Sequence, residues 1–141
     1  MRNVVALCLS LCLAAVLALS PVAAQQQGSL VGAWSYSGPL NAQGGSLSMF
    51  FQFGQDGSFR LRVIFPSGQS DYMGQYQVNG NSLQLLYRDY EPKQSCRYGA
   101  CYPIPPMVQM GQVYNQQIEF QGPTRFVFVD GGGAKLFVRA Q

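Results

Sequence analysis

Two cysteines, Cys96 and Cys101, lie in the proline-rich stretch CRYGACYPIPP of this 141-residue chain and suggest its most direct chemistry. Thiolates bind metals, attack substrates or form disulfides. Their spacing is wider than that of a Cys-x-x-Cys redox motif, and a structural zinc would need two more ligands. The chain has no histidine, and its other cysteines, Cys8 and Cys12, lie in an N-terminal apolar run. We therefore expect a disulfide between Cys96 and Cys101, and no metal or cofactor.

Carboxylates are the remaining candidates for catalysis, because the lack of histidine removes Ser-His-Asp and Cys-His triads. Aspartates 56 and 130 fall at predicted turns, where Asp is common. Asp71 would approach Asp89 and Glu91 only if their strands pair, and a solvated rim is the expected position for all three. A two-carboxylate glycosidase needs one acid with a raised pKa in a cleft. No such pair can be recognised, so we do not expect an enzyme.

Arginines and tyrosines are the candidate binding residues. Arg60, Arg62 and Arg88 would mark an anionic ligand if they pointed into a cavity. Arg60 and Arg62 alternate with apolar residues, which favours an outward direction, and the inward alternative stays open. The candidate ligand-binding residues are Tyr87, Tyr90, Tyr98 and Tyr102. Their rings would either cover an opening or form a contact surface for a ligand or a protein partner.

The N-terminus predicts export. Arg2 precedes an apolar run from Val4 to Leu19, which ends in Pro21 and the small residues 22–24, the pattern of a secretory signal peptide. The run is short for a membrane-spanning helix. We expect residues 1–24 to be removed and the mature chain, 25–141, to be periplasmic or secreted, without a membrane span. A disulfide would persist in that oxidising compartment.

The mature chain has the length of one small domain and a mild positive charge. Once Arg2 leaves, eight basic and six acidic residues remain, and the basic ones do not cluster. Because the net positive charge is small and the basic residues are scattered, we expect no nucleic acid or other polyanionic partner.

In the segments that carry these side chains, apolar and polar residues alternate with the period of two that is typical of β-strands, and no segment has the 3.6-residue spacing of a helix. Apolar residues alternate with polar ones in 46–53 and 59–65, and Asp56-Gly57 between them predicts a tight hairpin turn. A weak echo between Gly74–Leu85 and Gly111–Phe120 suggests that each is a hairpin. The predicted strands are residues 30–37, 46–53, 59–65, 72–78, 83–90, 108–114, 118–121, 125–129 and 134–139.

Eight or nine short antiparallel strands predict an all-β fold. A single small up-and-down β-barrel closes the sheet edges, and a sandwich is the alternative. An eight-stranded barrel has room inside for side chains or one small ligand. Nine Phe and eight Tyr are ample to fill it. The long irregular segment 91–106 is expected to lie over the barrel as a lid.

Two short motifs, LVGAW at Leu30–Trp34 and GQYQVNGNSLQL at Gly74–Leu85, carry a resemblance to a known family. The first is similar to the Gly-x-Trp opening of lipocalin-like (calycin-type) barrels, and the second to a hairpin of short secreted bacterial lipocalin-like domains. The resemblance implies that Trp34 plugs the barrel base and that an arginine packs across its ring, either Arg139 or its rival Arg125. It also implies binding of small apolar molecules. The chain departs from a full lipocalin in having no C-terminal helix pattern and no clear middle Thr-Asp-Tyr motif.

Two functions follow from this pattern. In the first, a small, mostly apolar ligand binds inside the barrel. In the second, the chain is an envelope protein-interaction or inhibitor module that presents the stapled segment 91–106 to a protein partner. Catalysis is the least expected function. Whether the barrel interior is open or filled distinguishes the first function from the others.

Overall fold

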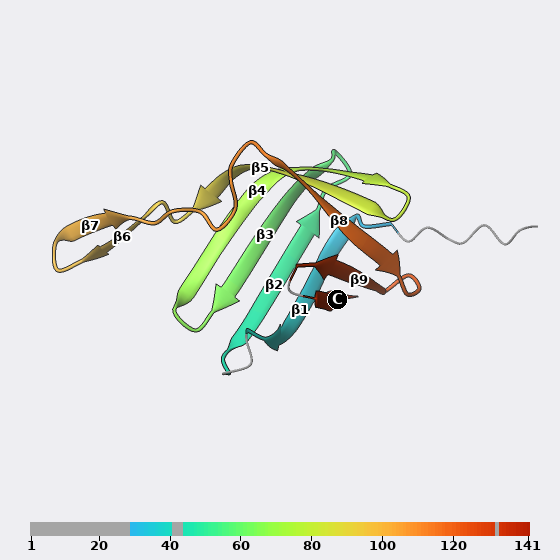
Figure 1. Ribbon diagram of the computed structural model, residues 1–141, viewed down its shortest axis with the longest axis horizontal. Coiled ribbons are helices and arrows are strands. Elements are labelled where there is room, and N and C mark those ends of the chain that lie inside the picture. Colours follow the sequence, from blue (N-terminus) through green and yellow to red (C-terminus); the bar gives the residue numbers. More distant parts are fainter. Residues whose placement is uncertain (1–28, 41–43, 132) are drawn as a thin grey trace, which may run out of the picture.

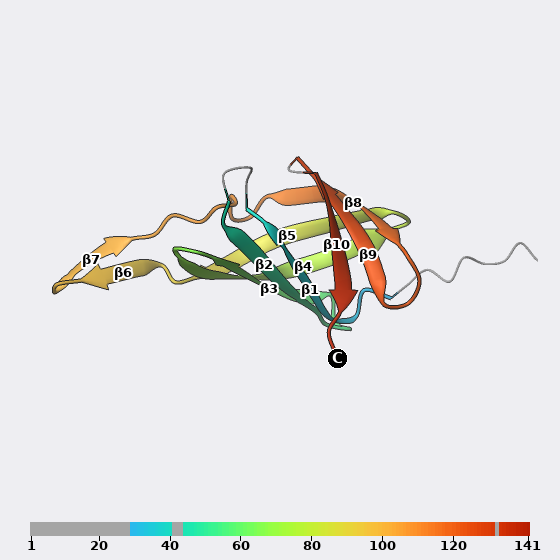
Figure 2. The ribbon, with the colours of Figure 1, turned by 90° about the horizontal axis from the view of Figure 1, so that it is seen from below.

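The computed structural model describes residues 29–40, 44–131 and 133–141, so the predicted signal peptide lies outside it. Within these residues there are ten strands and no helix. The strands are β1 (Gly32–Pro39), β2 (Ser46–Phe53), β3 (Ser58–Phe65), β4 (Gly68–Asn79), β5 (Ser82–Glu91), β6 (Gln94–Arg97), β7 (Ala100–Pro103), β8 (Val113–Phe120), β9 (Arg125–Asp130) and β10 (Gly133–Arg139). Eight close an antiparallel barrel in the order β1-β10-β9-β8-β5-β4-β3-β2, while β6 and β7 pair separately (Figures 1 and 2).

Tight hairpins join β2 to β3 and β4 to β5, as the alternation predicted. Gly57 (φ 79°) and Gly80 (φ 59°) supply the left-handed backbone that these turns require. Because side chains alternate across a strand, every second residue of β2 and β3 enters the barrel. The inward set from these two strands is wholly apolar, and its most deeply buried members are Phe51, Phe53, Phe59, Leu61 and Val63.

The predicted strands 108–114 and 118–121 are wrong, because residues 113–120 form the single strand β8. The echo with Gly74–Leu85 therefore does not mark a second hairpin. Asn115-Gln116-Gln117 looked like a polar turn, but Gln116 pairs with Leu83 of β5 in the middle of the strand. An inward polar residue at position 116 broke the apolar alternation on which the prediction depended.

Aromatic side chains fill and close one end of the barrel. Phe126 and Phe137 are fully buried and stack with their ring centroids 5.0 Å apart, and Trp34 meets Phe126 edge-on at 4.8 Å. The register sets Arg139 opposite Trp34, and its guanidinium lies 4.3 Å from the indole centroid. Arg125 is exposed on β9. The cation therefore covers the ring that blocks this end.

The segment 91–106 is an arm and not a lid, so the lid prediction is wrong. β6 and β7 form a hairpin in which Cys96 lies opposite Cys101, and the predicted disulfide joins them. Residues 91–103 are all exposed, and the hairpin projects away from the barrel (Figures 1 and 2). Because β6 consists of Gln94, Ser95, Cys96 and Arg97, it offers no apolar face that could pack on the barrel.

Candidate functional site

The barrel end opposite Trp34 contains a cavity of about 460 Å³. This volume falls within the range of roughly 300–1,000 Å³ that small-ligand sites occupy. Its rim comes from the connections at that end, namely Leu40 after β1, Ser67 between β3 and β4, and Met107 and Val108 before β8. The interior is therefore packed at one end and open at the other.

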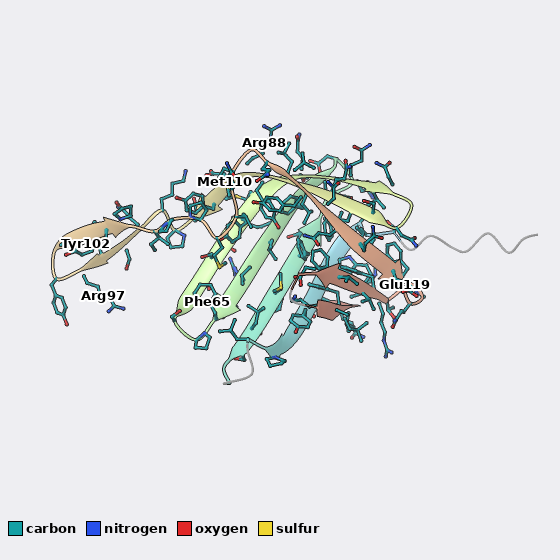
Figure 3. The ribbon with its side chains drawn as sticks, viewed as in Figure 1. Phe65, Arg88, Arg97, Tyr102, Met110 and Glu119 are labelled. Carbon is teal, nitrogen blue, oxygen red and sulfur yellow. A yellow bond between two sulfur atoms is a disulfide. The ribbon has the colours of Figure 1, made fainter. Side chains whose placement is uncertain are left out.

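One wall of the cavity is entirely apolar. It is formed by neighbouring strands β2 and β3, which pair along their length. The lining residues from these strands are Leu47, Met49, Phe51, Leu61, Val63 and Phe65. Phe65 lies at the open end of β3 (Figure 3). A wall of this composition favours an apolar molecule, because burying apolar surface releases about 25 cal/mol per Å².

Three tyrosines line the cavity beside the rim. The hydroxyl of Tyr72 accepts a hydrogen bond from the Met107 amide at 3.1 Å, and that of Tyr114 accepts one from the Gln109 amide at 2.8 Å. These bonds hold the segment before β8 against the barrel. Tyr87 packs edge-on against both rings, at centroid distances of 5.8 and 5.5 Å. The rim is therefore fixed by side chains of the cavity itself.

The hydroxyl of Tyr87 is unlike those of its neighbours. The residue is only 6% exposed, yet among the described residues no protein group hydrogen-bonds to its hydroxyl. Among the described residues, every polar side-chain atom that is fully buried has a hydrogen-bond partner. Because the Tyr87 hydroxyl has none, it is not fully buried, and it opens onto the cavity that Tyr87 lines. Burial raises the pKa of Tyr87 above its ordinary value, which keeps the group protonated.

An ion pair stands on the opposite side of the cavity from β2 and β3. The Lys135 ammonium lies 2.6 Å from each carboxylate oxygen of Asp130. Their side chains are 13% and 26% exposed, and both line the cavity. Lys135 alternates with Phe137 and so faces the interior of β10. The pair adds strong hydrogen-bonding groups to the cavity without adding net charge.

The structure separates the four tyrosines that the sequence singled out. Tyr87 lines the cavity, while Tyr90 stacks near Tyr72 and donates to the Ile104 carbonyl at 3.1 Å, at the root of the arm. Tyr98 and Tyr102 belong to the arm hairpin and are exposed. Figure 3 shows Tyr102 far from the side chains that crowd the barrel. Only the first two therefore lie at the open end.

Sequence reasoning missed the polar members of the cavity. The sequence predicts a turn at Asp130 and a polar turn at Gln116, and it does not single out Lys135. For Lys135 a signal existed, since it shares the inward face of its strand with Phe137. For Asp130 and Gln116, the position in the cavity follows only from how β8 and β9 pair, which the sequence pattern does not show. The pair Gln117 and Val129 sets the register that places Gln116 beside Asp130.

The three arginines lie outside the cavity. Arg62 donates two hydrogen bonds to Asp71, at 2.8 and 3.2 Å, and Arg88 contacts the Gln75 side chain at 3.5 Å. Arg60 is exposed on the same face of β3 as Arg62. The outward alternative is confirmed, and an anionic ligand held by these arginines inside the barrel is not supported.

The strands of the three candidate carboxylates do pair, with Asp71 opposite Glu91, but Asp71 and Asp89 each have a cation of their own. Glu91 and Asp89 lie on the solvated rim as expected, whereas Asp71 is buried, so the rim expectation is wrong for it. Asp71 binds Arg62, whereas Asp89 lies 2.9 Å from the Lys93 ammonium. The hydrogen bond from Lys93 lowers the pKa of Asp89, which is the opposite of what a catalytic acid needs. In the part of the chain that the structure covers, no three Asp, Glu, Cys or His side chains gather as a metal site requires. Nor does that part contain a helix with the length and apolarity to span a membrane.

Comparison with known proteins identifies the fold. The chain matches no family model and no curated protein. Among solved structures it is similar to a lipocalin-like protein from Bacteroides uniformis, with a TM-score of 0.50 and 19% identity over 80% of this chain and 100% of that one. An uncharacterized protein from Bacteroides eggerthii gives a TM-score of 0.49 and 15% identity over 79% and 100% of the two chains. The chain thus has the lipocalin-like fold that its motifs predicted, an all-β closed antiparallel barrel of eight strands.

Proposed function

We propose that the protein is an exported binding protein that holds one small, mostly apolar molecule in the barrel cavity and does not transform it. The cavity carries this proposal, because it is closed at the Trp34 end, open at the other, and apolar along β2 and β3. The separate pairing of Asp71 and Asp89 with cations supports binding without catalysis. The Cys96–Cys101 disulfide supports an oxidising compartment.

Filling the cavity should abolish binding. Val63 is buried with its side chain directed into the cavity, so Val63→Trp places an indole in space that the ligand needs. Overpacking costs little where the added atoms enter empty space. We expect the uncharged fluorescent probe N-phenyl-1-naphthylamine to bind the wild type saturably, and the variant at least about tenfold more weakly.

The matched control is Ile64→Trp, the next residue along β3, which is exposed on the outer face. It adds a comparable indole without entering the barrel, and we expect probe binding to stay unchanged. Unchanged binding in Val63→Trp, or equal losses in both variants, would contradict a site inside the barrel.

A second candidate, protein interaction through the arm, is favoured by one observation at its tip. Tyr98 is fully exposed with a left-handed backbone (φ 51°), beside Gly99 (φ 81°) in the hairpin turn. Non-glycine residues seldom adopt this conformation, and Asn or Gly usually occupies such a turn. Tyr and Arg are among the residues most enriched at interface hot spots, and Arg97 precedes Tyr98.

Removal of residues 94–103 separates the two candidates. Because the arm stands clear of the barrel, the shortened chain should keep its barrel circular dichroism and its probe affinity. If the arm binds a partner, a protein recovered from the native envelope fraction with the full chain should be absent with the shortened one. Identical partners with both chains would exclude the arm as the contact.

A further inference from the structure

Apart from Ser67 at the rim and Tyr72 of β4, whose hydroxyl accepts from the Met107 amide, the polar groups that line the cavity lie on one side. Tyr87 of β5, Gln116 of β8, Asp130 of β9 and Lys135 of β10 belong to successive barrel strands, whereas the wall from β2 and β3 is apolar. The β8–β9 register brings Gln116 next to Asp130, and Asp130 contacts Lys135. A ligand that satisfies both sides therefore needs an apolar body and one compact polar group.

The charges on this side cancel. Both carboxylate oxygens of Asp130 lie 2.6 Å from the Lys135 ammonium. A ligand carboxylate would bring a second negative charge next to Asp130 or pull Lys135 away from it. Either change leaves a charge uncompensated in a partly buried place, which costs far more than a neutral hydrogen bond gains. The three arginines that might have neutralised such a ligand lie outside.

Hydrogen-bonding capacity for an uncharged group is present. The Lys135 ammonium has three N–H donors, and its two hydrogen bonds go to the two carboxylate oxygens of Asp130. One donor is therefore left for a ligand. Tyr87 is only 6% exposed as a residue, and its hydroxyl opens onto the cavity and has no partner among the described residues. A hydroxyl can donate and accept, so it would complete the bonds of a ligand alcohol, carbonyl or amide.

Building on the proposed function, we propose that the ligand is an uncharged amphiphile. Its hydroxyl, carbonyl or amide group hydrogen-bonds to the Asp130–Lys135 pair or to the Tyr87 hydroxyl, and its apolar body lies along β2 and β3. The cavity discriminates against the carboxylate of the same chain length, because Lys135, the one cation among the described residues that line it, already has Asp130 as its partner.

Competition between decanol and decanoate tests this selectivity. At about pH 7.5 a carboxyl group is ionised, so the two compounds differ mainly in the charge of the head group. With bound N-phenyl-1-naphthylamine as the reporter, decanol should displace the probe from the wild type at a concentration at least about tenfold lower than decanoate.

Asp130→Asn should reverse the preference. The substitution keeps the shape of the side chain and leaves the Lys135 ammonium without its anion, so decanoate becomes the partner that restores neutrality. We expect decanoate to compete better than decanol, a change of at least about tenfold in their ratio. The matched control is Asp89→Asn, which breaks the exposed Asp89–Lys93 pair outside the barrel and should leave the ratio unchanged.

A second substitution keeps the test decisive if Asp130→Asn does not fold. Lys135→Met removes the cation and should make decanoate an even poorer competitor relative to decanol. Equal or tighter binding of decanoate by the wild type would overturn the neutral-ligand inference while leaving the proposed function intact. The inference is overturned in the same way if the probe binds but neither compound displaces it. If the probe itself shows no saturable binding, the proposed function fails together with the inference.

Discussion

Phe137→Ala should lower the free energy of unfolding by about 3–5 kcal/mol. The Phe137 side chain is fully buried in the closed end, where it stacks on Phe126 at 5.0 Å and meets Phe51 and Phe128 at 5.6 and 6.0 Å. Truncation removes these contacts and leaves a void that the neighbouring rings, anchored on other strands, cannot refill. Small domains have only about 5–15 kcal/mol of stability, so urea denaturation should show a large drop in the midpoint.

Val138→Ala is the control for this prediction. Val138 is the next residue of β10 and points outward, 42% exposed, so its truncation should change the stability by no more than about 0.5 kcal/mol. Similar losses in both variants would mean that the aromatic cluster is not the main source of stability at this end.

Arg139→Met should cost about 3 kcal/mol or more, the worth of one or two charge-assisted hydrogen bonds. The guanidinium donates to the carbonyls of Ser29, Val31 and Pro123, at 2.8, 2.9 and 3.2 Å, and covers Trp34. Methionine fills similar space but satisfies none of these carbonyls. A thermal denaturation series measures the loss, and Arg139→Lys should fall between, since lysine keeps the charge but not the planar fork.

The exposed Arg125→Met on β9 provides the comparison, with an expected effect within about 0.5 kcal/mol. Probe binding to Arg139→Met below its melting temperature should match the wild type, because Arg139 acts at the closed end. A loss of probe affinity without a loss of stability would show that the two ends of the barrel are coupled.

The barrel could be predicted from the sequence because most inward positions carry apolar side chains at a period of two. That pattern specified β2, β3 and the turn at Gly57, whereas closure of the sheet was preferred over a sandwich because a barrel leaves no exposed edges. The prediction was wrong at β8, where inward Gln116 imitates a turn residue. It was wrong again at the arm, because short polar strands such as β6 show no alternation and cannot be told from a loop.

The candidate site was less predictable than the fold, since it depends on where the interior is empty. Residues with the same inward pattern, such as Phe137 and Lys135, lie in the packed end and in the cavity wall respectively. Only the pairing of the strands around the barrel shows that Lys135 faces β2 and β3 across the cavity. Tyr98 and Tyr102 were grouped with Tyr87 by proximity in the chain, and the arm hairpin carries them away from it.

The position of Trp34 has a practical consequence for spectroscopy. It is the only tryptophan of the chain, and it lies in the closed end beneath Arg139 and against Phe126, not among the residues that line the cavity. Its emission is thus an internal gauge of whether the barrel base is intact. A ligand that does not absorb where tryptophan emits, such as decanol, should leave that emission almost unaltered when it enters the cavity, so its binding can be told apart from damage to the barrel base.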